Sequence, residues 1–206
     1  MRPNLWPNTP DILTEYLQHG DRAGFASRFM LAATLGASYG IYGPAFELAE
    51  GRSREAGSEE YLDSEKYQLR AWDLENPDSL RELITLVNRI RRENPALQTD
   101  RTLRFHATEN EQLIAYTKTT DDLGDVVLTV VNLDAHHTQR GMVTLPLDEL
   151  GMPRDKSYQA HELLSGARYM WNGPRNYVEI NPTSVAGQIF RFRRLVRSEH
   201  DFEYFQ

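Results

Sequence analysis

The chain has 206 residues, 40% hydrophobic and 26% charged, a composition typical of a folded globular protein. Its 23 Lys and Arg residues against 30 Asp and Glu residues give a net charge of -7, which argues against nucleic acid as a partner, because phosphate binding needs a basic surface. The absence of cysteine excludes disulfides and thiolate chemistry, and 206 residues are too few for a complete eight-stranded β/α barrel, which needs about 250.

The amino terminus lacks the apolar segment of a secretory signal, and no apolar stretch approaches the roughly 20 residues of a membrane helix. We therefore expect a cytoplasmic protein that does not bind membranes. The first ten residues contain three prolines and a tryptophan, with no helix or strand before them. This beginning is typical of a proline-rich arm or of a chain cut from a longer parent.

A short helix is predicted just after this segment. Thr9 is a favoured N-cap residue, Pro10 suits the first helical position, and Asp11 would complement the positive end of the helix. The apolar residues of 12–17 follow, and the glycine at position 20 would end the helix.

Two longer helices are predicted in the first half of the chain. The segment 21–35 is apolar on all sides, which indicates a buried helix. The segment 79–93 begins with Ser79 and Glu82 at the spacing of a capping box and continues with apolar residues at helical spacing. A short buried strand is predicted over 38–44.

A long acidic loop is predicted between this strand and the helix 79–93. Residues 47–65 include seven acidic side chains and two basic ones, together with several glycines and serines. Loops longer than about 12–15 residues are usually functional or disordered.

After residue 100 the hydrophobic period changes from 3.6 to 2, which predicts an antiparallel β-sandwich. In the last strand Phe190 and Phe192 alternate with Arg191 and Arg193, as one buried and one solvated face require. A boundary between two units is expected near 98–102. The predicted strands are 102–107, 112–118, 125–132, 138–145, 158–163, 177–180 and 188–193.

Several classes of functional site are excluded because the sequence lacks their motifs. The six histidines have no metal-binding spacing, and no phosphate-binding loop, dinucleotide fingerprint or serine-nucleophile motif is present, so we expect neither a metal nor a cofactor. Carboxylates remain, and pairs of carboxylates break glycosidic bonds. Asp11 is the best candidate for such a catalytic acid, and the alternative is that it only complements a helix dipole.

Four stretches resemble the maltosyltransferases that use α-maltose 1-phosphate, a family of the α-amylase clan, glycoside hydrolase family 13. The first is specific, because amylases in general carry His-Asp where this chain has Pro10 and Asp11. The resemblance covers nearly the whole chain and weakens toward 200–206. The four stretches are 2–13, 32–47, 57–67 and 86–97.

The resemblance implies an α/β fold followed by an all-β one. Residues 1–100 would be the C-terminal part of a (β/α)8 TIM barrel, and residues 101–206 an antiparallel β-sandwich domain. Without the rest of the barrel, the predicted helices are expected to expose large apolar patches. The barrel elements would be strand 7 ending at 1–9, helix 7 at 21–35, strand 8 at 39–43 and helix 8 at 79–93.

The family's reaction transfers a maltosyl unit from α-maltose 1-phosphate to the non-reducing end of an α-1,4-glucan, releases phosphate and retains the anomeric configuration. The resemblance implies that the nucleophile, the general acid and the residues that contact phosphate lie upstream, so the chain alone is expected to be inactive. Asp11 would be the third carboxylate, which stabilises the transition state. The parent is expected to be a homodimer.

Three further residues are implied to bind substrate. Lys66 and Tyr67 match a pair that lines the donor-sugar subsites, and Asn8 would shape the turn that holds Asp11. For Lys66 the alternative is a solvated partner of Glu65 and Asp63.

Aromatic residues leave two further alternatives open. Trp6 could be a core residue, and the pair Tyr169 and Trp171 could form a sugar platform or simply pack in a hairpin.

Two other functions compete with the maltosyltransferase assignment. One is a non-catalytic carbohydrate-binding β-module with a helical arm. The other keeps the clan and makes the parent a glucan hydrolase or a branching enzyme.

Overall fold

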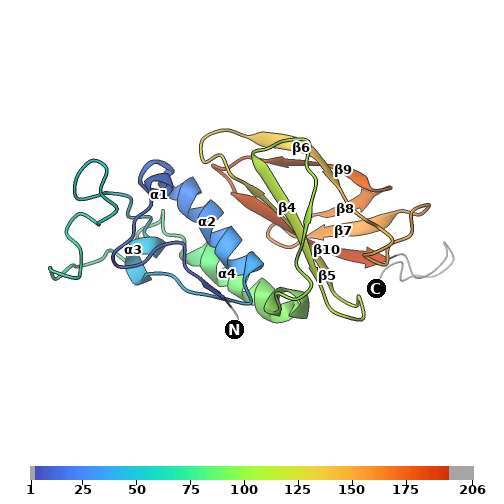
Figure 1. Cartoon of the computed structure of the whole chain (residues 1–206), viewed down its shortest axis with the longest axis horizontal. Helices are drawn as coiled ribbons and strands as arrows, with labels where there is room; N and C mark the ends of the chain where they lie inside the picture. Colours follow the sequence, from blue (N-terminus) through green and yellow to red (C-terminus); the bar gives the residue numbers. More distant parts are fainter. Residues whose placement is uncertain (1–2, 195–206) are drawn as a thin grey trace.

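The computed structural model describes residues 3–194, which form helices at one end and antiparallel sheets at the other (Figure 1). The helices are α1 (Glu15–His19), α2 (Asp21–Leu35), α3 (Gly43–Glu47), α4 (Arg81–Glu93) and a 3-10 helix η1 (Pro95–Gln98). The strands are β1 (Asn4–Leu5), β2 (Ser38–Tyr39), β3 (Arg104–His106), β4 (Leu113–Thr119), β5 (Val126–Asn132), β6 (Gln139–Thr144), β7 (Tyr158–Glu162), β8 (Arg168–Trp171), β9 (Arg175–Ile180) and β10 (Gly187–Arg194).

Two antiparallel sheets make up the second half. The larger sheet has six strands in the order β3-β4-β5-β10-β7-β8, and the smaller pairs β6 with β9. Apolar side chains from both sheets form one cluster, to which Leu128 and Phe190 contribute from the large sheet and Val143 and Val178 from the small one. The predicted alternation in the last strand is confirmed at Phe190, which is 2% exposed.

The helices cover the opposite face of the large sheet. Val127, Val131 and Ile189 point away from the small sheet and join Phe25 and Phe29 of α2 in a second apolar cluster. Strand β5 is therefore buried along its whole length, with one set of alternate residues on each side.

The helix predicted over 21–35 is confirmed as α2, and the strands predicted after residue 100 all occur, with bounds that differ by a few residues. Strand β8 was not predicted, because three of its four residues are exposed and give no alternating pattern.

The amino end of α4 differs from the sequence prediction. The helix begins at Arg81, and the Ser79 hydroxyl accepts a hydrogen bond from the Arg81 amide at 3.1 Å while donating to Glu47 at 3.0 Å. The predicted capping box with Glu82 is therefore wrong. The end of α3 also meets α4 here, since the Leu80 amide donates to the Glu47 carbonyl at 2.7 Å.

The strand predicted over 38–44 is shorter than expected. Only β2 is extended, and it pairs with β1 in a parallel register in which Asn4 lies opposite Ser38. Gly43 has a φ of +32° and begins α3, which ends the extended backbone.

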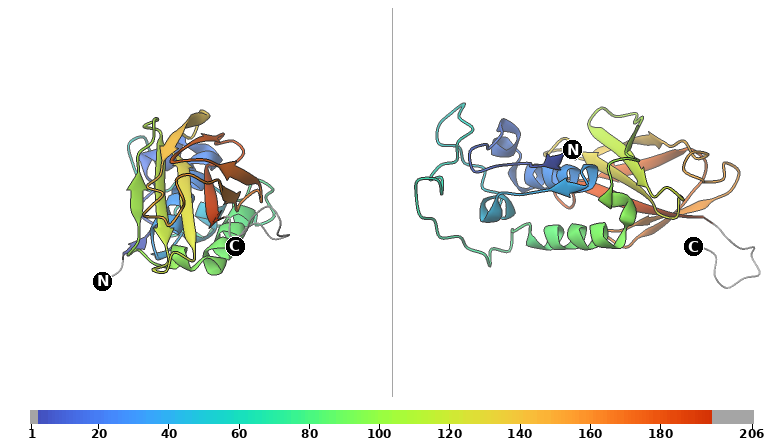
Figure 2. Two further views of the ribbon diagram at one scale, coloured as in Figure 1. Left: turned by 90° about the vertical axis from the view of Figure 1, so that its right-hand side faces the viewer. Right: turned by 60° about the horizontal axis from the view of Figure 1, so that its bottom comes forward.

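The loop predicted over 47–65 is confirmed and continues to the start of α4. It lies at the end of the molecule away from the sheets, where Figures 1 and 2 show it in teal beyond α1 and α3. Across residues 3–194, no helix is long and apolar enough to cross a membrane.

Candidate functional site

Asp11 lies at the tip of a tight turn and not in a helix. The Thr9 amide donates to the Ile12 carbonyl at 3.2 Å, and the Ile12 amide donates back to Thr9 at 3.3 Å, so Pro10 and Asp11 occupy the two corner positions. The predicted short helix is confirmed at its end, since Gly20 is the C-cap of α1, but its predicted start is wrong, because α1 begins only at Glu15. The carboxylate is therefore not part of a helical first turn, and its side chain is 60% exposed.

The long loop brings Lys66 to Asp11. The Lys66 ammonium donates to Asp11 Oδ1 at 2.8 Å, across 55 residues of sequence, and lies 5.3 Å from the centre of the Tyr67 ring. The bond to Asp11 raises the pKa of Lys66. The structure thus gathers three of the four predicted site residues on one exposed surface, and the partner of Lys66 is Asp11 rather than Glu65 or Asp63.

Asn8 is buried beneath this surface, with 1% of its area exposed. Its amide nitrogen donates to the Tyr61 hydroxyl at 2.7 Å, and its oxygen accepts from the Tyr42 amide at 3.0 Å. Asn8 therefore joins the Asp11 turn to the segment after β2 and to the long loop, and it offers no free group at the surface.

Glu65 holds the loop in place beside Lys66, a role that sequence reasoning missed. Its two carboxylate oxygens accept hydrogen bonds from Trp72 Nε1 at 2.9 Å and from the Tyr42 hydroxyl at 2.7 Å. These bonds, that from Trp72 first, lower the pKa of Glu65. Burial, followed by the carboxylate of Glu65, raises the pKa of Tyr42 to about 12.

A second anchor lies at Glu50, which sequence reasoning also missed. Arg70 donates to Glu50 Oε2 at 2.9 Å and stacks its guanidinium 4.0 Å from the Trp72 ring centre, and Arg52 binds the other oxygen. Burial opposes the charge of Glu50, but the bonds from the two arginines outweigh it, so its pKa is lowered. No periodic pattern marks such contacts between loop residues, which is why the sequence did not reveal them.

Beside Tyr67 the loop is hollowed into a cavity of about 380 Å³. Its lining is mostly polar and includes hydroxyl, carboxylate, amide and guanidinium groups. These groups can exchange hydrogen bonds with a ligand that carries many hydroxyls. The lining residues are Arg54, Glu60, Tyr61, Leu62, Asp63, Ser64, Tyr67 and Gln68.

The remaining aromatic candidates lie elsewhere. Trp6 is 50% exposed and lies over Gly40, where a Cβ would come within 2.4 Å of the indole, so Trp6 is not a core residue. Trp171 is 8% exposed and packs against Phe190 with ring centres 5.0 Å apart, whereas Tyr169 is 44% exposed.

The comparisons with known proteins agree on a sequence family. Residues 105–192 match the family described as GLGE, C-terminal. The chain is 49% identical over 197 residues to an alpha-1,4-glucan:maltose-1-phosphate maltosyltransferase of Chlorobaculum tepidum, covering 93% of the chain and 29% of that protein. The enzyme of the same name from Myxococcus xanthus is 44% identical over 205 residues, covering 100% of the chain and 30% of that protein.

Solved structures show the same fold at low sequence identity. An α-amylase from Geobacillus thermoleovorans superposes with a TM-score of 0.55 at 13% identity, covering 86% of this chain and 34% of that one. The protein AmyP superposes with a TM-score of 0.60 at 16% identity, covering 92% of this chain and 41% of that one. The fold of this chain is thus α-amylase-like, and the chain spans about 29% of the length of its curated relatives. By its sequence the chain belongs to the family of the alpha-1,4-glucan:maltose-1-phosphate maltosyltransferases.

Proposed function

We propose that this chain is the C-terminal portion of a retaining transferase that moves maltosyl units from α-maltose 1-phosphate to the non-reducing end of an α-1,4-glucan and releases phosphate. The names of its relatives support this substrate pair. The observation that carries the proposal is the contact of Asp11 with Lys66 beside the exposed Tyr67, since a carboxylate, an ammonium and an aromatic ring are the groups that bind a sugar.

Asp11 acts in this proposal as the third carboxylate of the site. A retaining glycosyl transfer needs a nucleophile and a general acid about 5–5.5 Å apart, which we assign to residues outside this chain. Asp11 binds hydroxyls of the reacting sugar and favours its distorted, oxocarbenium-like form, so it lowers the barrier more than it strengthens ground-state binding.

Lys66 and Tyr67 bind the donor sugar. The buried Asn8 helps to position them by holding the loop through Tyr61. Lys66 and Asp11 form an ion pair that is largely exposed to solvent, and such pairs contribute little to stability. A sugar hydroxyl that enters between them can replace the ion pair at small cost. Through its two hydrogen bonds, Asn8 holds the Tyr61 hydroxyl of the loop and the backbone amide of Tyr42 in place.

We further propose that residues 1–100 complete a β/α barrel and that residues 101–206 form a sandwich domain that packs against these residues. The parallel pairing of β1 with β2, with α2 between them in sequence, supports the first part, because neighbouring barrel strands are joined in this way. The position of the loop after β2 is consistent with the catalytic end of such a barrel.

The test uses the whole protein of which this chain is the proposed C-terminal part. Phosphate release from α-maltose 1-phosphate is measured together with the growth of an α-1,4-glucan acceptor. Asp11→Asn is expected to lower kcat about 100-fold or more with a small change in KM, and Lys66→Met to raise KM for the donor. Asp155→Asn, an exposed aspartate in the loop between β6 and β7, is the matched control and should leave both constants unchanged.

Two results would overturn different parts of the proposal. Absence of phosphate release by the wild-type protein, with reducing sugar formed instead, would replace the transferase with a hydrolase. An active wild type whose Asp11→Asn variant keeps a normal kcat would remove Asp11 from the catalytic machinery.

A further inference from the structure

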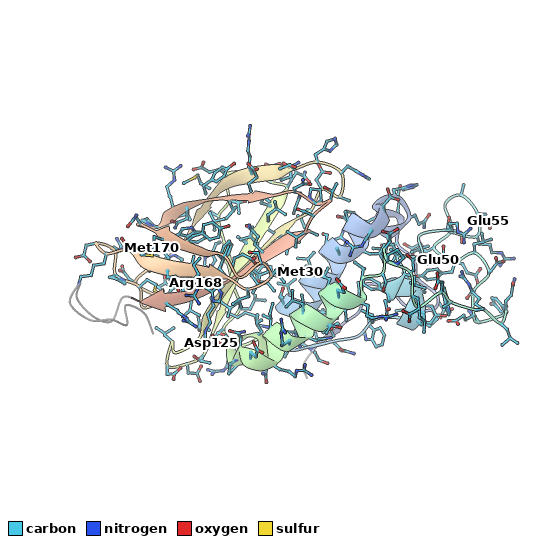
Figure 3. All side chains as sticks on the ribbon, turned by 180° about the vertical axis from the view of Figure 1, so that it is seen from behind. Met30, Glu50, Glu55, Asp125, Arg168 and Met170 are labelled. Carbon is cyan, nitrogen blue, oxygen red and sulfur yellow. The ribbon has the colours of Figure 1, made fainter. Side chains whose placement is uncertain are left out.

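The outer face of strands β10, β7 and β8 carries a cluster of basic side chains that the helices leave uncovered. The strand register places Arg191, His161 and Arg168 side by side in one row across the three strands. Arg193 lies two residues from Arg191 on β10, opposite Gln159, and therefore on the same face. Figure 3 shows Arg168 and Met170 over the strands on the side from which α4 is also seen.

These side chains lie within reach of one ligand. Adjacent strands are about 4.8 Å apart, so the row from Arg191 to Arg168 spans roughly 10 Å. Ile189 precedes Arg191 on this face and lies under the helices, which marks where the helical cover stops. Beyond that point Arg168 is exposed, and His161, Arg191 and Arg193 are half-buried.

Positive charge is concentrated here in a chain whose net charge is -7. Asp125 is the carboxylate at the edge of the cluster, with Oδ1 3.1 Å from Arg191 Nε. Within the described residues 3–194, neither Arg168 nor Arg193 has an acidic group within 4.0 Å. Burial lowers the pKa of His161, and the positive charges of Arg168 and Arg193 lower it further, because nearby cations disfavour a protonated imidazole.

Two polar atoms on this face are buried without a partner. His161 Nδ1 and Gln159 Oε1 are inaccessible to solvent and form no hydrogen bond in the part of the chain described. The nearby Glu162 does not serve them, because its carboxylate accepts from the Ile189 amide and from Ser165. Buried polar groups are rarely left unpaired, and those that are invite a functional explanation.

We propose that Arg168, Arg191, Arg193 and His161 form a binding site for a phosphate group, carried by inorganic phosphate or by a small phosphate monoester. Guanidinium groups match a tetrahedral dianion because each can donate two parallel hydrogen bonds. A single carboxylate would offer two oxygens and one charge to three guanidinium groups, and would leave most of their donors unused. A long polyanion is disfavoured, because the row of basic side chains spans only roughly 10 Å and the chain as a whole carries a net charge of -7.

The proposal is independent of the proposed transferase function, and it is tested on the 206-residue chain. Binding of inorganic phosphate and of glycerol phosphate is measured by calorimetry in chloride of matched ionic strength, and the histidine ring signals are followed by NMR. We expect saturable binding of both ligands and a shift of the His161 signals, with the His136 signals unchanged. Stronger binding of either ligand identifies free phosphate or a monoester as the better source.

Charge-matched variants separate a built site from general attraction. Arg168→Gln and Arg193→Gln should each weaken binding about tenfold, the loss of one charge-assisted contact. Arg140→Gln, an exposed arginine of β6 in the other sheet, makes the same change in net charge and should leave binding unaltered. Melting temperatures of the three variants verify that each is folded.

Three outcomes overturn the proposal. Equal weakening by Arg140→Gln would reduce the effect to net charge, and a lack of saturation would mean that no site exists. A truncation after Arg194 that raises phosphate affinity tenfold would identify the acidic segment 195–206 as the natural occupant in place of phosphate.

Discussion

Glu65 holds the loop next to Lys66 through hydrogen bonds from Tyr42 and Trp72. Lys66 is a long side chain on an exposed loop, and holding it in one position costs side-chain entropy. The hydrogen bonds from Tyr42 and Trp72 to Glu65 restrict the backbone immediately before Lys66. Less conformational entropy is therefore lost when Lys66 binds Asp11. The geometry of the candidate site therefore depends on a residue outside it.

We expect Glu65→Gln to loosen this loop without unfolding the protein. An amide has one oxygen in place of two charged ones, so Tyr42 or Trp72 loses its acceptor, while the helices and sheets are untouched. Amide hydrogen exchange should accelerate over 60–68, and the melting temperature should change by at most a few degrees.

The control for this change is Glu55→Gln in the same loop. Glu55 is exposed, and its carboxylate accepts no hydrogen bond from residues 3–194. Exchange over 60–68 should match the wild type in this variant. Equal protection in Glu65→Gln and the wild type would show that Glu65 does not anchor the loop.

For single residues, the sequence predicts which side chains lie in the candidate site better than it predicts the backbone structure that holds them. Asp11 is the best candidate acid by its place in the sequence, the resemblance implies Lys66 and Tyr67, and the structure places the three together. The turn that holds Asp11 was mistaken for a helix start, because Thr9 and Pro10 are equally favourable in tight turns. What decided between them is the pairing of the Leu13 amide with the Glu59 carbonyl at 2.6 Å, a contact that no local pattern reveals.

Among the elements, Lys118 connects strand β4 to two helices. Its buried ammonium donates to the Leu35 carbonyl at the end of α2 at 3.0 Å and to the Leu97 carbonyl in η1 at 3.3 Å. The Asp100 carboxylate lies 3.7 Å away. A cation at the carboxyl ends of helices satisfies carbonyls that have no partner within the helix.

We expect the stability supplied by Lys118 to increase with pH between 8 and 10. Burial lowers the pKa of Lys118 to about 8, below its ordinary value of 10.5. The unfolded chain therefore binds more protons than the folded one in this range, so the free energy of unfolding rises with pH. A neutral amine keeps two N–H donors for the two carbonyls.

The measurement compares the unfolding of wild type and Lys118→Met by denaturant at pH 8, 9 and 10. At pH 8 the variant should be less stable by about 1–3 kcal/mol, because two buried carbonyls lose their donor, and the difference should widen as the pH rises. Lys156→Met, at an exposed lysine, is the control and should show neither effect. A difference that narrows with pH would mean that Lys118 is more favourable charged than neutral in the fold.

Regular elements were the most predictable level of the structure. The sequence predicts α2 and β5 because both are buried on most sides and therefore mostly apolar, and it predicts β10 because Phe190 and Phe192 alternate with arginines. The sequence does not predict strand β8, because its exposed residues give no alternation, or the start of α4, because that start depends on a contact with a distant residue. The Ser79 hydroxyl, for example, donates a hydrogen bond to the carboxylate of Glu47, 32 residues earlier.

Across the whole molecule, the helices and the large sheet share one apolar core. Ser27 of α2 donates to the Asn132 carbonyl at 3.1 Å, and the Tyr16 hydroxyl donates to the Leu133 carbonyl at 2.9 Å. The expectation that the segment 21–35 exposes a large apolar face is wrong, because α2 is covered by the large sheet and by α4, and Phe25 and Phe29 are fully buried. The first hundred residues therefore complete the hydrophobic core of the second hundred.

Because of this shared core, residues 101–206 produced alone should not behave as a stable monomer. Removal of the helices would expose Val127, Val131 and Ile189 on one sheet face, each a loss of about 1.5–3 kcal/mol. Size-exclusion chromatography should show association, and the melting temperature should lie below that of the full chain. Changing these three residues to threonine should restore a monomer in the isolated piece and destabilise the full chain, where the same positions are buried. A monomeric isolated piece that melts at the same temperature as the full chain would show that the sandwich is stable without the helices.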